Sequence, residues 1–178
     1  MDDIVKAAIK KWPNVPHCYG WLALDARGDW YLRDEPTQAA GPFPQVKGSR
    51  IEHDKFKEFI HRNYEHDERG AWFFQNGPQR VYLQLEAAPW VLGVRALGVP
   101  DGRYEVMTHT GLPVHDVRSS WLDEQGRLFL ETEHGLGLVR SMDMDAAADA
   151  VGAEVWTPQE MAFADMPAHF GFVCQPAP

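Results

Sequence analysis

The sequence of 178 residues has few cysteines and no long apolar run. Cys18 and Cys174 are its only cysteines, which are too few for a disulfide scaffold and show no C-x-x-C spacing for a metal. No stretch approaches the roughly 20 consecutive apolar residues of a membrane-spanning helix, and no basic segment followed by an apolar run opens the chain. We therefore expect a cytoplasmic protein with two reduced thiols and no membrane contact.

Positive charge is also scarce. The chain has 17 Lys and Arg against 26 Asp and Glu, which gives a formal charge of -9. A field of this sign repels polyanions such as DNA and the acidic surface of a bilayer. The composition therefore disfavours nucleic acid as a partner.

The common catalytic and nucleotide-binding motifs are missing. The sequence contains no G-x-G-x-x-G, G-x-x-x-x-G-K-[ST], G-x-S-x-G or H-E-x-x-H motif and no EF-hand loop. Convergent active sites need no such motif, so the missing motifs do not exclude an enzyme. They do make catalysis less expected. We expect no cofactor and no metal.

Large apolar side chains, by contrast, are plentiful. Apolar residues make up 44% of the chain, and seven Trp, nine Phe and five Tyr provide rigid surfaces to bury. We expect residues 1–178 to fold as a single domain around this core.

Apolar spacing and turn residues predict many strands and a few helices. Residues 5–12 have the spacing of an amphipathic helix, and the tetrapeptides 25–28 and 123–126 suit turns between paired strands. Three prolines predict an irregular loop over 34–45, and 157–160 has the cap, proline and glutamate of a short helix.

Aspartates mark the starts of two further helices. Asp54 is expected to cap one, and Asp143 or Asp145 the other. A turn over 98–102 should join two strands in the middle of the chain, and 170–174 should form an edge strand.

The chain contains an internal duplication. A shift of 98 places aligns His17 with His115, Leu24 with Leu122, Asp25 with Asp123, Gly28 with Gly126 and Leu32 with Leu130. A shift of 91 then aligns the two capped helices, so the loop before the second helix is seven residues shorter. Because turn residues and core leucines agree with the expected hairpins, the match indicates two copies of one structural unit.

The duplication predicts an α+β, antiparallel-sheet-rich fold. Two repeated units of β-hairpin, strand and helix, at about 15–97 and 103–175, should pack together, with short helices near the termini. Each unit alone would leave one apolar sheet face exposed, so each supplies the cover the other needs. A groove between two such units is a frequent ligand site.

The order of these features resembles that of known families. A glycine turn, a Trp-containing strand, a capped helix, the aromatic strand 72–74 and the segment 80–90 (RVYLQLEAAPW) are similar to uncharacterised bacterial domain-of-unknown-function proteins built from repeated strand-helix motifs. The resemblance covers about 15–151, and its motifs are structural. For at least one such family a signal-transduction role has been proposed, so the resemblance implies a regulatory protein without established catalytic residues.

Histidines give the strongest polar candidates. His17 and His115 hold equivalent places before the two hairpins, and Asp116 follows the second. If the fold brings them together, they can form an acid-base pair or hold a divalent metal; a structural role in closing the loop before each hairpin is the favoured alternative. His17 and Cys18 are not expected to form a catalytic pair, since neighbours in an extended segment point to opposite faces.

Two other groups allow more than one interpretation. Glu131, Glu133 and His134 have the composition of a ligand cluster, but a polar strand end before Gly135 also explains them. Most aromatic residues should lie in the core; in the run 72–74, however, at least one side chain points away from it and can line a ligand groove, unless both faces of the strand are covered. The candidate ligand-binding residues are His17, His115, Asp116, Trp72, Phe74 and Trp90.

These observations favour a non-catalytic ligand-binding or regulatory, signalling-related protein that recognises a small molecule or a partner chain between its repeats. The alternative is a small-molecule hydrolase or isomerase that uses a histidine/aspartate site there. A third alternative is a homodimer that pairs through an exposed edge strand, such as 170–174.

Overall fold

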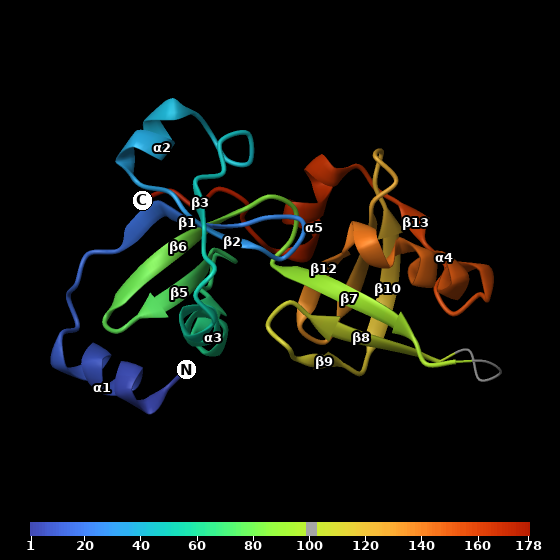
Figure 1. Cartoon of the computed structure of the whole chain (residues 1–178), viewed down its shortest axis with the longest axis horizontal. Helices are drawn as coiled ribbons and strands as arrows, with labels where there is room; N and C mark the ends of the chain where they lie inside the picture. Colours follow the sequence, from blue (N-terminus) through green and yellow to red (C-terminus); the bar gives the residue numbers. More distant parts are fainter. Residues whose placement is uncertain (99–102) are drawn as a thin grey trace. The chain divides into compact units, whose positions relative to one another are not determined.

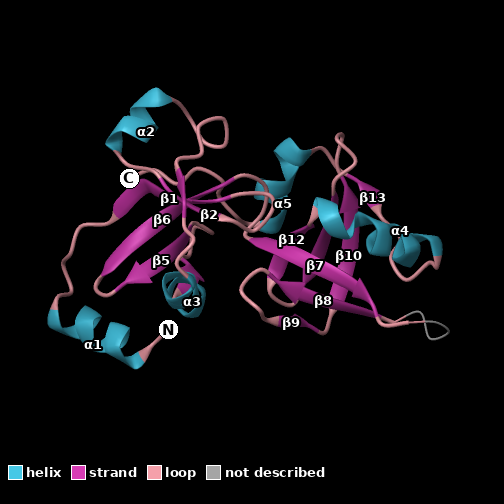
Figure 2. Cartoon of the chain, viewed as in Figure 1, coloured by secondary structure: helices cyan, strands magenta, loops and turns pink. Residues whose placement is uncertain are grey.

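The computed structural model describes residues 1–98 and 103–178 and divides into two compact units. Unit 1 comprises Met1–Asp25, Asp29–Ala87 and Gly171–Pro178, and unit 2 comprises Ala26–Gly28 and Ala88–Phe170. The described residues form 13 strands and five α-helices (Figures 1 and 2). The predicted α+β class is confirmed.

Unit 1 is built on a six-stranded sheet with three helices. The strand order is β3-β2-β1-β6-β5-β4, in which β1 and β6 are parallel and the other neighbours antiparallel. The elements are α1 (Asp3–Lys11), β1 (Cys18–Leu24), β2 (Trp30–Leu32), α2 (Glu35–Ala40), β3 (Ser49–Arg50), α3 (Asp54–Arg62), β4 (Tyr64–His66), β5 (Trp72–Asn76) and β6 (Gln79–Leu85).

Strand β5 shows how the sheet of unit 1 buries side chains on both faces. Phe74 points toward α3, where the ring centroids of Phe56 and Phe59 lie 6.1 and 5.3 Å from its own. Phe73 lies on the opposite face with Tyr82 of β6, and both are buried. Three consecutive aromatic residues are therefore compatible with one strand because both faces are covered.

The segment 171–178 also belongs to unit 1. Val173 forms an isolated parallel bridge with Ala71, and the amide of Leu85 donates to the carbonyl of Cys174 at 2.8 Å. The expected edge strand over 170–174 is therefore wrong, because these residues make single contacts and no continuous ladder.

Unit 2 is built on a seven-stranded sheet with two helices. The strand order is β13-β10-β11-β12-β7-β8-β9, with parallel pairing at β13–β10 and β12–β7. The elements are β7 (Trp90–Ala96), β8 (Tyr104–Thr108), β9 (Pro113–Val114), β10 (Val117–Leu122), β11 (Leu128–Thr132), β12 (Gly135–Val139), the 3-10 turn η1 (Ser141–Asp143), α4 (Met144–Gly152), β13 (Gln159–Glu160), the 3-10 turn η2 (Phe163–Asp165) and α5 (Met166–Phe170).

The two units contain the same hairpin, third strand and helix. The register of β1 with β2 recurs in β10 with β11 at the predicted shift of 98, and in each unit the first strand also pairs in parallel with a strand that follows the helix. The pairs are Leu22–Leu32, Ala23–Tyr31 and Leu24–Trp30 in unit 1, and Ser120–Leu130, Trp121–Phe129 and Leu122–Leu128 in unit 2. The predicted pair of similar units is confirmed.

The hairpin turns of the two units use a buried aspartate in the same way. The amide of Asp29 donates to the Asp25 carboxylate at 2.9 Å, and that of Arg127 donates to the Asp123 carboxylate at 2.8 Å. Each aspartate also holds a cation at 2.7 Å, Lys47 for Asp25 and Arg127 for Asp123. Gly28 and Gly126 supply the positive φ angles that the turns require, +88° and +73°.

Several local predictions differ from the structure. The loop predicted over 34–45 contains the short helix α2, because Pro36 stands in its first turn, where a missing N–H does no harm, and Asp34 caps it. No helix forms over 157–160; Gln159–Glu160 are instead β13, the edge strand beside β10. The turn predicted over 98–102 lies largely outside the described residues.

The predicted helix caps also differ. His53, not Asp54, caps α3, since its Nδ1 accepts the amide of Phe56 at 3.3 Å. Asp143 stands at the start of α4 but makes no cap bond; its carboxylate binds Arg140 at 2.6 Å and the amide of Val94 at 3.1 Å. None of the described helices has the length and hydropathy to cross a bilayer.

Candidate functional site

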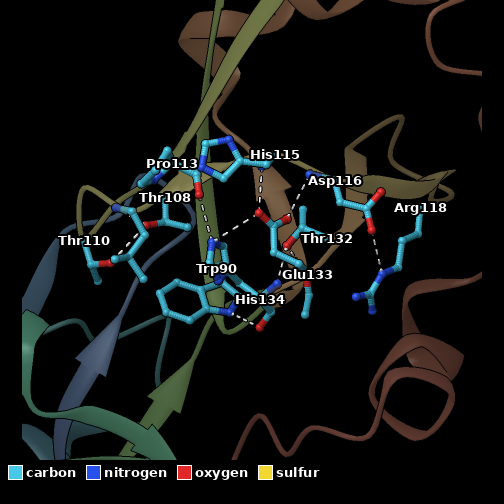
Figure 3. A network of polar contacts seen from close by, with 12 residues as sticks. Trp90, Thr108, Thr110, Pro113, His115, Asp116, Arg118, Thr132, Glu133 and His134 are labelled. Carbon is cyan, nitrogen blue, oxygen red and sulfur yellow. Dashed lines mark hydrogen bonds and ion pairs between the residues drawn. The ribbon is translucent and has the colours of Figure 1, made fainter.

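Three of the six predicted ligand-binding residues lie in unit 2, around the turn between β11 and β12 (Figure 3). Trp90 begins β7, and His115 and Asp116 form the link between β9 and β10. The turn residues Glu133 and His134 contact all three. The structure therefore brings Trp90, His115 and Asp116 into one polar network.

Glu133 fixes the backbone of the link between β9 and β10. Its Oε1 accepts the amide of His115 at 2.7 Å, and its Oε2 accepts the amide of Asp116 at 3.2 Å. Partial desolvation raises the pKa of Glu133, but these amide bonds and the nearby His134 outweigh it, so that the pKa lies below its usual value. We call Glu133 with these two amides the Glu133 clamp; its carboxylate is ionised at neutral pH.

His134 and Trp90 support the clamp from the other side of the turn. The Trp90 indole N–H donates to the carbonyl of His134 at 2.7 Å, and their ring centroids lie 5.9 Å apart. Nε2 of His134 lies 2.9 Å from the carbonyl of Pro113 and 3.7 Å from Glu133 Oε1. Because a carbonyl only accepts, Nε2 of His134 donates the hydrogen bond to Pro113.

Two threonines order the backbone around this turn. Thr132, which is fully buried, accepts the amide of His134 at 3.1 Å and donates to the carbonyl of Gly135 at 2.9 Å. Thr108 accepts the amide of Leu112 at 3.0 Å just before β9. Both sides of the network therefore stand on hydrogen-bonded turns.

The side chains of His115 and Asp116 project from the clamp and are exposed. Asp116 accepts Arg118 Nε at 3.1 Å, in an ion pair whose partners are both more than half exposed. Such a pair contributes little to stability. These groups are therefore available for hydrogen bonds and charge contacts with another molecule.

The other three predicted residues lie in unit 1. His17 is exposed before β1 and meets the edge of Tyr82 with ring centroids 5.6 Å apart. Trp72 and Phe74 are buried: Trp72 packs on Tyr64, and Phe74 packs on α3. A shared site of His17 and His115, which belong to different units, stays a prediction.

The role of Glu133 is the functional feature that sequence reasoning left open. The position of Glu133 could have been predicted from the hairpin register. This register sets Val117 opposite Thr132 and so brings Asp116 beside Glu133. In residues 1–98 and 103–178 no three His, Cys, Asp or Glu side chains are grouped so that they could hold a metal ion.

A family model matches nearly the whole chain. The model is DUF2944, described as "Protein of unknown function (DUF2946)", and it covers residues 1–177. The chain belongs to this family. No curated protein matches the sequence significantly.

Two solved structures resemble this DUF2944 chain. A DUF1285 family protein from Silicibacter pomeroyi DSS-3 has 13% sequence identity and a TM-score of 0.50, with 84% of each chain covered. A DUF1285 family protein from Shewanella baltica OS155 has 18% identity and a TM-score of 0.49, over 73% of this chain and 91% of the other. At 13% identity, the resemblance to the Silicibacter pomeroyi protein shows a similar fold and nothing about function.

Proposed function

We propose that the protein binds a small molecule or a partner chain without converting it, in a regulatory, signalling-related role, and that the contact surface lies at the Glu133 clamp. The observation that supports this is the 2.7 Å bond from the amide of His115 to Glu133, which fixes the backbone beneath two exposed polar side chains. Binding groups held in place before contact lose less conformational entropy when the complex forms.

The geometry supports binding better than catalysis. A general base that works near neutral pH needs a pKa close to 7, whereas the pKa of Glu133 is lowered and both of its oxygens accept backbone amides. Asp116 is paired with Arg118 in the solvent. The carboxylates near His115 therefore suit positioning and charge recognition better than proton transfer.

The proposal also places the protein in the bacterial cytoplasm. Neither Cys18 nor Cys174 forms a disulfide, which is compatible with a reducing compartment.

Native mass spectrometry of protein purified from its own cells tests the proposal. We expect a bound compound or chain that is retained in Asp149→Asn and lost in His115→Ala and Asp116→Asn. Asp149 is an exposed aspartate on α4 of the same unit, so its variant matches the charge change of Asp116→Asn.

Two results would contradict the proposal. Equal recovery of the bound species from all variants would remove the Glu133 clamp from recognition. Conversion of the recovered compound by fresh wild-type protein, abolished in His115→Ala, would make the protein an enzyme.

A further inference from the structure

Unit 1 has a surface hollow of about 440 Å³ that lies outside the network of Figure 3. It is formed by the turn after β4 and the start of β6. Its volume lies within the range of small-molecule sites, about 300–1,000 Å³. The lining residues are His66, Asp67, Glu68, Arg69 and Arg80.

Arg80 is the cation that the hollow offers to a ligand. Its guanidinium carbon lies 4.4 Å from the centroid of the Phe73 ring, and that ring is almost fully buried. Within the described part of the chain, no carboxylate lies within 4.0 Å of the Arg80 guanidinium. Stacking on a fixed ring orients the guanidinium plane and leaves its N–H edge able to bind an oxyanion through two parallel hydrogen bonds.

Asp67, a half-buried acid of the hollow, is already saturated with donors. Its Oδ1 accepts the amides of Arg69 and Ala71 at 2.9 and 3.0 Å, and its Oδ2 accepts Tyr82 Oη and Arg69 Nε at 3.1 and 3.2 Å. Four donors offset the charge of this carboxylate and fix the turn. Asp67 therefore shapes the hollow without neutralising Arg80.

His66 has a defined orientation at the rim. Its Nδ1 lies 3.0 Å from the carbonyl of Asp67, so Nδ1 donates and Nε2 remains as the second polar atom of the ring. The imidazole also contacts Trp72, with ring centroids 4.9 Å apart. The rim is thus held by the same turn that holds Asp67.

We propose that this hollow binds the carboxylate group of a small organic acid, with the Arg80 guanidinium as its anchor. This site is independent of the Glu133 clamp, since it lies in the other unit and uses a cation. A carboxylate matches the planar guanidinium edge and carries one charge. A phosphate dianion is disfavoured, because Glu68 lies in the lining and the chain has a formal charge of -9.

An NMR titration tests the site with sodium acetate as the probe and sodium phosphate as the comparison, at constant ionic strength. The arginine Nε–Hε signals and the amide signals of 66–70 report on the hollow directly. We expect saturable shifts with acetate, and weaker binding of phosphate at pH 7.5. Arg80→Gln should weaken acetate binding by about tenfold or more, since it removes a charge-assisted pair.

Two further variants separate the anchor from general charge effects. Arg80→Lys keeps the charge but loses the planar fork, so its affinity should fall between those of wild type and Arg80→Gln. Arg95→Gln removes an exposed arginine of unit 2 that pairs with Glu105, and it should leave acetate binding unchanged.

The proposal is overturned if wild type shows no saturable shift in 66–70, or if Arg80→Gln, with an otherwise native spectrum, binds acetate as wild type does. Tighter binding of phosphate than of acetate would overturn the assignment to a carboxylate. If Arg95→Gln lost as much acetate affinity as Arg80→Gln, the loss would be a long-range charge effect and Arg80 would not be the anchor.

Discussion

The helices α3 and α4 hold equivalent places in the two units but pack through different side chains. In α3, Phe56 and Phe59 meet Phe74 of the sheet, whereas the aligned residues of α4 are Ala147 and Ala150, both fully buried. The three aligned strand pairs and the bond from a backbone amide to the turn aspartate are the same in both units. A backbone motif can therefore be kept while the volume between helix and sheet changes, provided that each interface stays close-packed.

The largest difference in stability between the two units should appear when substitutions alter the interfaces of α3 and α4 with their sheets. Phe74→Ala should lower the free energy of unfolding by about 3–5 kcal/mol, because it leaves a cavity beneath α3. Ala150→Leu should lower it by about 1–3 kcal/mol through overpacking beneath α4. Urea denaturation measures both, and amide hydrogen exchange locates the loss in α3 or α4. A greater loss from Ala150→Leu would show that α4 has the tighter interface.

Replacing the two buried aspartates should give a smaller difference in stability than altering the two helix–sheet interfaces. Asp25→Ala should cost about 3 kcal/mol, because Lys47, from a loop 22 residues away, would lose its 2.7 Å ion pair and keep only the longer one to Glu86. Asp123→Ala should cost about 2 kcal/mol, because Arg127 lies in the same turn and can reach water. Urea midpoints of these variants, with Asp25→Asn and Asp123→Asn as milder controls, test the order. The reverse order would mean that local turn bonds matter more than the loop.

A pH dependence should distinguish α3 from α4. Burial and the nearby Lys57 lower the pKa of His61 in α3, and its Nε2 accepts the Trp30 indole N–H at 3.0 Å. The unfolded chain therefore binds the proton first as the pH falls, so this stabilisation is complete above about pH 6.5 and is lost as the pH falls through the lowered value. The position in α4 aligned with His61 is Gly152, which cannot titrate.

Hydrogen exchange at pH 7.5 and 5.5 measures this effect. Protection of α3 should fall more than that of α4 at the lower pH, and His61→Gln should reduce the difference. An unchanged pH dependence in His61→Gln would assign the effect to another group.

The smallest expected difference between the units concerns the rate at which a cysteine thiol is alkylated. Burial raises the pKa of Cys18, so its alkylation by iodoacetamide at pH 7.5 should be slow. Asp116 holds the aligned position in unit 2 and is exposed, so Asp116→Cys should react roughly several-fold faster at its new thiol than Cys18 does. Peptide mass mapping distinguishes the two sites, and equal rates would contradict the difference in burial.

The repeated motif was predictable because its signals are local. Asp25 and Gly28 specify a turn whose geometry sets the register of both strands, and the same pair recurs at Asp123 and Gly126. The errors occurred where tertiary contacts override local propensity. Residues 157–160 have the signature of a helix, but pairing with β10 makes Gln159 and Glu160 a strand.

The candidate site was predictable only in part. His115 and Asp116 stood out by their place before a hairpin, but the partner that holds their backbone, Glu133, follows from a register that includes a bulge. The hollow around Arg80 joins the turn after β4 to β6, and its cation-π contact depends on which face of β5 carries Phe73. Amino-acid composition does not specify which face of a strand a given side chain occupies.

The bridge between Ala71 and Val173 has a consequence for synthesis of the chain. On the ribosome, residues 88–170 emerge before residues 171–178, which complete unit 1, and can fold first. The nascent first unit therefore lacks the contacts of Val173 with Ala71 and of Cys174 with Leu85 until residues 171–178 have left the ribosome.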